Sequence, residues 1–226
     1  SADDIEIALT IANESGIPVL PRGGGTSQCG QTTGTALVID NSKHFRKILS
    51  SDLSDPDHAT VEVEPGMVLD HLNAHLKSYG LWYPVDVSTG AQATIGGMAG
   101  NNSCGSRSIA YGNMVHNVLG IDAWLADGQL AQFANYGQST GSAKQLGDFV
   151  KGLANRLQPD IEAMFPKVMR RVAGYNLDVF HPQSEKPYTS DGSVNLAHLL
   201  VGSEGTLAYF KSLQLKLSPL PQHKVL

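Results

Sequence analysis

The sequence has little of what defines several common classes of protein. Its two cysteines, Cys29 and Cys104, are too few for a disulfide framework and form no C-x-x-C pair. We therefore expect reduced thiols in a cytoplasmic protein, with peripheral attachment to the inner membrane left open. No apolar run is long enough for a membrane span. Basic residues form no run beyond Arg170-Arg171 and the net charge is −5, which argues against nucleic-acid binding.

Two common phosphate-binding motifs are missing. The residue three after Gly25 is Gln28, so there is no G-x-G-x-x-G, and there is no G-x-x-x-x-G-K-[ST]. A nicotinamide Rossmann site and a P-loop NTPase are therefore disfavoured. His71 and His75 have the spacing of a metal pair on a helix, but the Glu of H-E-x-x-H is missing between them. We expect no metal in this chain.

Hydrophobic periodicity predicts a mixed α+β fold for the 226 residues. Helices alternating with strands in the first third favour βα units and a parallel sheet, and the second part favours a hairpin and mostly β-structure. Residues 84–113, rich in Gly, Ser, Thr and Asn, predict a long functional loop. The expected helices are 3–15, 45–50, 67–79 and most of 142–171, and the expected strands are 19–20, 36–39, 60–64, 118–124, 129–133, 207–210 and 212–217.

A glycine-rich loop directly follows the first predicted strand. Residues 21–30 read Pro-Arg-Gly-Gly-Gly-Thr-Ser-Gln-Cys-Gly. Glycine accepts φ > 0 and lets backbone N–H groups approach a ligand, and successive N–H groups in one concavity form an anion site. Arg22 adds a cation, and Thr26 and Ser27 add hydroxyl donors. A tight turn without a ligand is the alternative, but a diphosphate would use all three features.

A second glycine-rich cluster covers residues 93–105 and offers the side chains of Thr94, Asn101, Asn102 and Ser103. One such cluster alone is compatible with an Ω-loop that binds nothing. Two clusters, each placed after a predicted strand, suit an extended ligand with phosphates at one end and a flat ring system at the other. A dinucleotide such as FAD has this shape.

Five motifs in order carry a resemblance to a known family. They are Pro-Arg-Gly-Gly-Gly-Thr from residue 21, Val-Glu-Pro-Gly from residue 63, Thr-Ile-Gly-Gly-x-x-x-Asn-Asn-x-x-Gly from residue 94, Tyr-Gly-Asn-x-Val-x-Asn-Val-Leu-Gly from residue 111, and Gly-Ser-Glu-Gly-Thr-Leu from residue 202. The chain thereby resembles the FAD-binding (PCMH-type) domain of the vanillyl-alcohol-oxidase superfamily, in its FAD-linked oxidase group. That group includes D-lactate, glycolate and D-2-hydroxyglutarate dehydrogenases. Residues 165–177 resemble the large members fused to an iron–sulfur module.

The resemblance implies a two-subdomain FAD-binding fold. A small α/β subdomain would cover residues 1–81, and a larger antiparallel sheet with flanking helices would cover residues 82–226. The cofactor would lie between them. The family's cap domain, which contacts the substrate, would be absent from this chain.

The resemblance also implies which residues hold FAD. The loop after the first strand would hold the diphosphate, and later segments would line the rest of the cofactor. By position, the residues at the diphosphate would be Arg22, Gly23, Gly24, Gly25, Thr26 and Ser27, and those along the cofactor would be Pro84, Asp86, Ser88 and Gly90. The residues that line the flavin and ribityl region would be Thr94, Gly97, Asn102, Ser103 and Gly105. The residues near the adenosine would be Tyr111, Gly112 and Val118, and those that close the site would be Glu204 and Gly205.

Covalently linked members of the superfamily carry a histidine in the first glycine loop, and this chain has none there. Cys104 follows the Thr94-Ile95-Gly96-Gly97 motif, whereas a second covalent link is expected before it. We therefore expect non-covalent FAD. The catalytic residue stays unknown. Arg170 and Arg171 are candidates for binding a carboxylate, but a solvated helix end or cofactor packing is the favoured explanation. His116 and His198 are candidate bases, but a core or surface histidine is the favoured explanation.

The resemblance implies an FAD-dependent oxidoreductase that oxidises a D-2-hydroxy acid by hydride transfer to flavin N5. Electrons would pass to an iron–sulfur module or another acceptor outside this chain, and the chain alone would be inactive. An alcohol or alditol oxidase built on the same domain is one alternative. A non-catalytic nucleotide-binding module is another.

Overall fold

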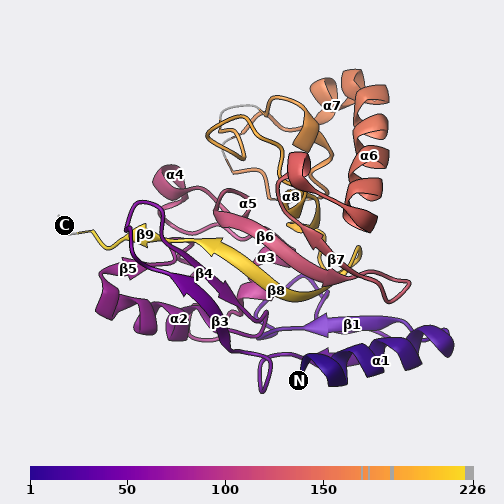
Figure 1. The fold of residues 1–226 in the computed structure, drawn as a ribbon, viewed down its shortest axis with the longest axis horizontal. Coiled ribbons are helices and arrows are strands. Elements are labelled where there is room, and N and C mark those ends of the chain that lie inside the picture. Colours follow the sequence, from indigo (N-terminus) through magenta and orange to yellow (C-terminus); the bar gives the residue numbers. More distant parts are fainter. Residues whose placement is uncertain (169, 173, 184–185, 222–226) are drawn as a thin grey trace.

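A five-stranded antiparallel sheet in the order β3-β4-β8-β6-β7 forms the centre of the structure (Figure 1). The computed structural model describes residues 1–168, 170–172, 174–183 and 186–221. Two smaller sheets, β1-β2 and β5-β9, flank the central one. In chain order the elements are α1 (Ala2–Glu14), β1 (Val19–Arg22), β2 (Leu37–Asp40), β3 (Ile48–Asp52), β4 (Thr60–Val63), α2 (Leu69–Leu76), η1 (Lys77–Tyr79), β5 (Leu81–Trp82), α3 (Ile95–Asn101), α4 (Ser108–Tyr111), α5 (Met114–Asn117), β6 (Val118–Trp124), β7 (Leu130–Phe133), η2 (Tyr136–Gln138), α6 (Gly141–Arg156), α7 (Gln158–Met164), η3 (Leu177–Phe180), α8 (Ala197–Leu200), β8 (Tyr209–Lys216) and β9 (Ser218–Pro219).

The N-terminal helix and the first two strands follow the sequence prediction. Ser1 caps α1, because its side chain accepts a hydrogen bond from the Asp4 N–H in a capping box, and the chain leaves the helix at Gly16 with φ +65°. Ile5 packs in a small cluster with Phe45 and with Trp124 and Tyr209 of the central sheet. Strand β1 pairs with β2 in parallel. The predicted parallel sheet of the first third is limited to this pair, because β4 pairs antiparallel with both β3 and β8.

The predicted helix at residues 45–50 is wrong. Strand β3 begins at Ile48 and pairs antiparallel with β4, and the Lys47 N–H donates a 2.6 Å hydrogen bond to the Glu64 carboxylate. The Ser50 hydroxyl also donates to Glu62 across the strands. A six-residue window has a weak intrinsic preference, and cross-strand pairing overrides it.

The β6–β7 hairpin matches the prediction from Asp127-Gly128. Gly128 has φ +81°, and the Asp127 carboxylate accepts a 3.0 Å hydrogen bond from the Gln129 N–H. Strand β8 lies between β4 and β6, so residues from both halves of the chain build one sheet. The predicted α+β class with a large antiparallel sheet is confirmed.

Residues 84–113 are not one loop, because they contain α3 and α4, and α5 follows directly. Thr94 caps α3, because its hydroxyl oxygen accepts a 3.4 Å hydrogen bond from the Gly97 N–H. Met98, within the same helix, is buried. A Cβ added to Gly96 would lie 2.4 Å from the Pro65 ring, so glycine is needed where α3 meets the turn after β4. The glycines that lower helix propensity thus serve tertiary packing.

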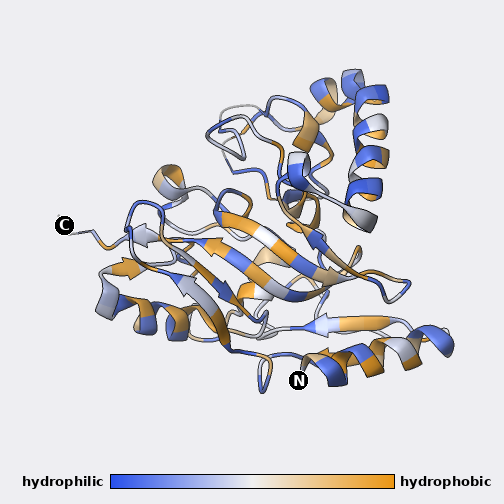
Figure 2. Cartoon of the chain, in the orientation of Figure 1, coloured by the Kyte–Doolittle hydropathy of each residue, from blue (hydrophilic) through white to orange (hydrophobic). Residues whose placement is uncertain are grey.

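The main hydrophobic core lies around the central sheet. Val63 of β4, Ile121 of β6, and Leu213 and Leu215 of β8 are buried at 0–1% exposure. Figure 2 shows hydrophobic residues along much of β6 and alternating hydrophobic and hydrophilic residues along β8. Helices α6 and α7 extend away from the sheet in a separate lobe (Figure 1).

The central sheet continues across residue 81, because β3 and β4 precede that residue and β6, β7 and β8 follow it. The division into subdomains at residues 1–81 and 82–226 stays a prediction. Helix α1 and the parallel pair β1-β2 form a layer beside the central sheet (Figure 1).

Candidate functional site

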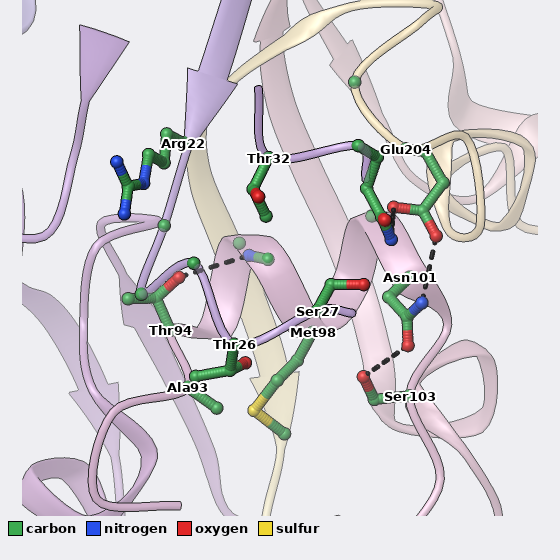
Figure 3. Close-up of a pocket in the computed structure, with 18 of the residues that line it drawn as sticks. Arg22, Thr26, Ser27, Thr32, Ala93, Thr94, Met98, Asn101, Ser103 and Glu204 are labelled. Atoms are coloured by element: carbon green, nitrogen blue, oxygen red, sulfur yellow. Dashed lines mark hydrogen bonds between the residues drawn. The ribbon is translucent and has the colours of Figure 1, made fainter. Parts of the chain in front are cut away.

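A cavity of about 440 Å³ opens where the glycine-rich loop after β1 meets α3 and the turn before β8 (Figure 3). Its volume falls in the range of about 300–1,000 Å³ that small-molecule sites occupy. Three glycine-rich segments far apart in the sequence supply most of its wall. They are residues 21–28, residues 93–104 and residues 204–205.

The glycine-rich loop presents an open row of backbone donors. None of the N–H groups of residues 23–28 donates a hydrogen bond to a residue that the structure describes. Gly25, at φ +66°, turns the loop so that Thr26 and Ser27 also line the cavity. Backbone donors left without partners beside a cavity require a ligand or water. Such a row suits a phosphate oxygen or another anion.

Two glycines of this loop are also required by packing. A Cβ on Gly23 would lie 2.1 Å from the Thr94 hydroxyl oxygen, and a Cβ on Gly24 would lie 2.1 Å from the Gln92 carbonyl oxygen. The loop therefore rests directly on the segment that begins α3. Because Gly23 and Gly24 have no side chains, the loop can pack closely on this segment and still leave its backbone N–H groups uncovered.

The opposite side of the cavity is built by a polar chain of contacts. Asn101 Nδ2 donates to Glu204 at 2.9 Å, the Ser103 hydroxyl donates to Asn101 at 3.0 Å, and Gln31 Nε2 lies 3.4 Å from Glu204 (Figure 3). Glu204 adopts φ +52°, which is rare for a residue with a side chain. Non-glycine residues in this region cluster at binding sites.

Arg22 lies at the other end of the cavity, beyond the loop from Glu204 (Figure 3). Its guanidinium would be 2.7 Å from a Cβ on Gly25, so it lies against the loop backbone. Hydrogen bonds from Ser42, and then the charge of Arg22, lower the pKa of Asp40. The cavity therefore has a cation at one end and a carboxylate at the other, with Thr26 and Ser27 of the glycine-rich loop between them (Figure 3).

Of the predicted site residues, twelve line this cavity. They are Arg22, Gly23, Gly24, Gly25, Thr26, Ser27, Ser88, Thr94, Gly97, Ser103, Glu204 and Gly205. The remaining eight do not line it: Pro84, Asp86, Gly90, Asn102, Gly105, Tyr111, Gly112 and Val118.

Several of these eight residues support the wall from behind. Asp86 accepts from the Ser106 hydroxyl at 2.7 Å and forms a 3.4 Å ion pair with Arg107. A Cβ on Gly105 would lie 2.0 Å from the Asp86 carboxylate, so glycine makes room for that carboxylate. Asn102 ends α3 in the left-handed conformation, at φ 51°.

The other residues of this set are packed elsewhere. Tyr111 packs edge-on against Trp82, with ring centroids 5.3 Å apart. Val118 is buried at the start of β6, and Pro84 is buried after β5. Gly90 lies against Asp70, and Gly112 lies against His116 at φ +81°.

Some lining residues carried no signal in the sequence. Gln31 and Thr32 follow the glycine-rich loop, and extending that motif by a few residues would have included them. Asn41 and Phe210 reach the cavity because distant segments fold together, and no local pattern marks them. Val172 lies in the segment 165–177, whose family resemblance indicated no cofactor contact.

The four candidate catalytic residues do not line the cavity. Arg171 donates to Asp178 at 2.8 Å as a buried ion pair, and Arg170 is exposed. Burial lowers the pKa of both His116 and His198 to about 4, so both rings are neutral at pH 7. Met169 and Ala173 of the segment 165–177 lie outside the described residues.

Within the described ranges, no three His, Cys, Asp or Glu side chains are grouped so that they could hold a metal ion. In the same ranges, no helix has both the length and the apolar character that crossing a membrane requires.

A family model described as an FAD binding domain matches residues 1–134. The chain belongs to this family of FAD binding domains. The match includes both the glycine-rich loop and α3, and the resemblance inferred from the five motifs is confirmed.

Curated relatives include D-2-hydroxyglutarate dehydrogenase of Pantoea ananatis, which is 33% identical over 98% of this chain and 22% of its own length. Glycolate oxidase subunit GlcD of Bacillus subtilis is 32% identical over 99% of this chain and 37% of its own length. The chain thus spans about a fifth to a third of these relatives. A solved structure of alkyldihydroxyacetonephosphate synthase superposes with a TM-score of 0.62 at 18% identity, covering 98% of this chain and 31% of that protein, which shows a shared fold.

The residues of the cavity fit FAD. The unpartnered N–H groups of residues 23–28 and the nearby Arg22 would meet a diphosphate, and Asn101, Ser103 and Glu204 would meet the hydroxyl groups of a sugar or ribityl chain. When bound, FAD supplies a two-electron acceptor.

Proposed function

We propose that this chain binds FAD non-covalently in the cavity between the glycine-rich loop, α3 and Glu204. The observation that carries the proposal is that residues 23–28 line the cavity and that their N–H groups have no partner among the described residues. A diphosphate carries two negative charges close together, and successive backbone donors stabilise such a group without adding a counter-charge. The proposed direction is diphosphate at the Arg22 end and hydroxyl groups at the Glu204 end.

The proposal of non-covalent binding is supported by the lining of the cavity. Its described residues include no histidine, and Cys104 is its one thiol. We propose that Cys104 acts as a small packing residue. Heat or acid should then release all the flavin from the polypeptide.

We further propose that the domain serves an oxidoreductase that oxidises a D-2-hydroxy acid. Support comes from the relatives that match 98–99% of this chain, which are named as a D-2-hydroxyglutarate dehydrogenase and a glycolate oxidase subunit. Substrate contacts would come from a cap domain, and electrons would pass to an iron–sulfur module or another acceptor. Since the cavity lining includes no histidine and none of the four candidate catalytic residues, the chain alone should bind FAD without turnover. A cytoplasmic location belongs to the same proposal and is supported by two unpaired cysteines.

Redox competence is tested on the FAD-loaded chain under anaerobic conditions. Dithionite should bleach the flavin band, and ferricyanide should restore it. Flavin that is bound but not accessible to either reagent would favour the alternative of a structural nucleotide module. Steady oxidation of D-2-hydroxyglutarate or D-lactate by the chain alone would contradict the proposed need for a cap.

A further inference from the structure

Asn41 lines the cofactor cavity, although it lies outside the three glycine-rich segments that supply most of the wall. It directly follows β2, and its exposed fraction is 6%. Asparagine is mostly found at protein surfaces, and a buried polar side chain normally has hydrogen-bond partners. The contacts of Asn41 therefore indicate what its side-chain amide does in the cavity.

The main chain of Asn41 is held by three contacts. Its N–H donates to the Arg22 carbonyl oxygen at 2.9 Å, and its own carbonyl oxygen accepts from the Phe45 N–H at 3.2 Å. A Cβ on Gly66 would lie 2.0 Å from that carbonyl oxygen, so the turn after β4 packs directly against it. Asn41 is thus fixed beside the end of β1, where the row of unpartnered N–H groups begins at Gly23.

The side chain of Asn41 is oriented by Tyr209. The Tyr209 hydroxyl donates to Asn41 Oδ1, and Tyr209 is itself buried in β8. Burial raises the pKa of Tyr209, so its hydroxyl keeps the proton that it donates. The Tyr209 ring packs edge-on against Trp124, with ring centroids 6.1 Å apart. Because a buried hydroxyl proton needs an acceptor, Oδ1 faces Tyr209 and the Nδ2 group points away from it.

The Nδ2 group of Asn41 is available to a ligand. It donates to no residue that the structure describes, and protein atoms do not enclose it completely. Since Asn41 lines the cavity, its two N–H bonds can reach a group bound there. An amide nitrogen of this kind donates and does not accept, so the matching ligand atom is a hydrogen-bond acceptor.

We propose that Asn41 binds a phosphate oxygen of the cofactor through Nδ2, and that Tyr209 is the positioning residue that directs this amide into the cavity. The inference rests on the proposed binding of FAD, and it adds one side-chain donor to the row of backbone donors that begins at Gly23. A hydrogen bond from a neutral donor to an ionised phosphate is stronger than one between two neutral groups.

Affinities for FAD and for ADP test the contact with the phosphate. Asn41→Ala should weaken the binding of both by about tenfold or more, because both ligands carry the diphosphate. Asn41→Asp has nearly the same shape and keeps the acceptor for Tyr209, but it replaces the donor with a negative charge. It should therefore weaken FAD binding more than Asn41→Ala does. Asn155→Asp makes the same change at an exposed position of α6 outside the cavity and should leave both affinities unchanged.

A double-mutant cycle tests the positioning role of Tyr209. Tyr209→Phe should weaken FAD binding by about threefold, because the Asn41 amide loses the hydrogen bond that orients it. In the Asn41→Ala background, Tyr209→Phe should cause no further loss. If Tyr209 only stabilised the fold, its substitution would weaken FAD binding equally in both backgrounds.

Urea unfolding of the FAD-free chains establishes that each variant is folded before its affinity is compared. Wild-type affinity for FAD or for ADP in Asn41→Ala would overturn the contact with the phosphate, as would an Asn41→Asp chain that binds FAD as well as the wild type. Equal losses from Tyr209→Phe in both backgrounds would overturn the positioning role. A folded wild-type chain that binds no FAD would instead contradict the proposed function, so the two failures are distinguishable.

Discussion

Gly24→Ala tests whether the glycine-rich loop rests on the segment before α3. The added Cβ would lie 2.1 Å from the Gln92 carbonyl oxygen and 2.9 Å from its carbon. Ordinary contact begins near 3.4 Å, so the two backbones must separate by about 1.3 Å. Both neighbours are backbone, and neither can rotate away. Overpacking of this kind costs about 1–3 kcal/mol of the free energy of unfolding.

The same displacement should disturb the row of N–H donors. A hydrogen bond to a charged group contributes about 1.5–3 kcal/mol, so misplacing even one should raise the Kd for FAD by about tenfold or more. Urea unfolding measures the stability change, and flavin fluorescence measures the Kd. Gly152→Ala is the matched control, because that glycine lies inside α6 with no atom within 4 Å of its added Cβ. It should stabilise the protein by up to about 1 kcal/mol and leave FAD binding unchanged.

A second control separates side-chain from backbone collisions. In Gly23→Ala, the added Cβ would lie 2.1 Å from the Thr94 hydroxyl oxygen. Removing that hydroxyl in the double variant Gly23→Ala/Thr94→Ala should therefore restore part of the stability lost in Gly23→Ala. No single side-chain change can do this for Gly24→Ala, because its collision is with the Gln92 backbone. A Gly24→Ala protein with wild-type stability and wild-type FAD affinity would refute the placement of the two segments.

Two further predictions concern buried groups outside the cofactor cavity. Arg171→Met should lower the free energy of unfolding by about 3 kcal/mol or more, because it leaves the Asp178 carboxylate buried without its cation. Urea unfolding measures this change. An unchanged urea midpoint would contradict the ion pair. Burial lowers the pKa of His198 from 6.5 to about 4 in the folded chain. Between pH 6.5 and about 4, the unfolded chain therefore binds more protons than the folded chain. The free energy of unfolding should fall by up to about 3 kcal/mol as the pH falls through this range. His198→Gln should flatten that part of the pH profile, and an equally steep profile in the variant would assign the loss to other groups.

The sequence predicted the elements whose signals are local. Helix α1 has its cap at Ser1 and its stop at Gly16, and the β6–β7 turn is marked by Asp127-Gly128. Strand β3 was missed because its pairing with β4 decides its structure. Helix α3 was missed because its glycines are selected by contact with Pro65 and by close packing, which no propensity scale records.

The candidate site shows the same division. The glycine-rich loop and Glu204 were predicted from motifs, and both line the cavity. Asn41 and Phe210 reach the cavity from segments with no motif of their own, so the sequence could not mark them. Asp86 and Asn102 were predicted as contacts but lie behind the wall, because a motif gives the order of residues and not the direction of each side chain.

FAD titration into the purified chain, followed by heat release, tests the central claim most directly. The account predicts one FAD bound per chain by flavin absorbance and fluorescence, weakened binding in Gly24→Ala, and complete recovery of free flavin after heating. A folded chain that binds no FAD, that binds it equally well in the Gly24→Ala variant, or that keeps the flavin attached after denaturation would contradict it.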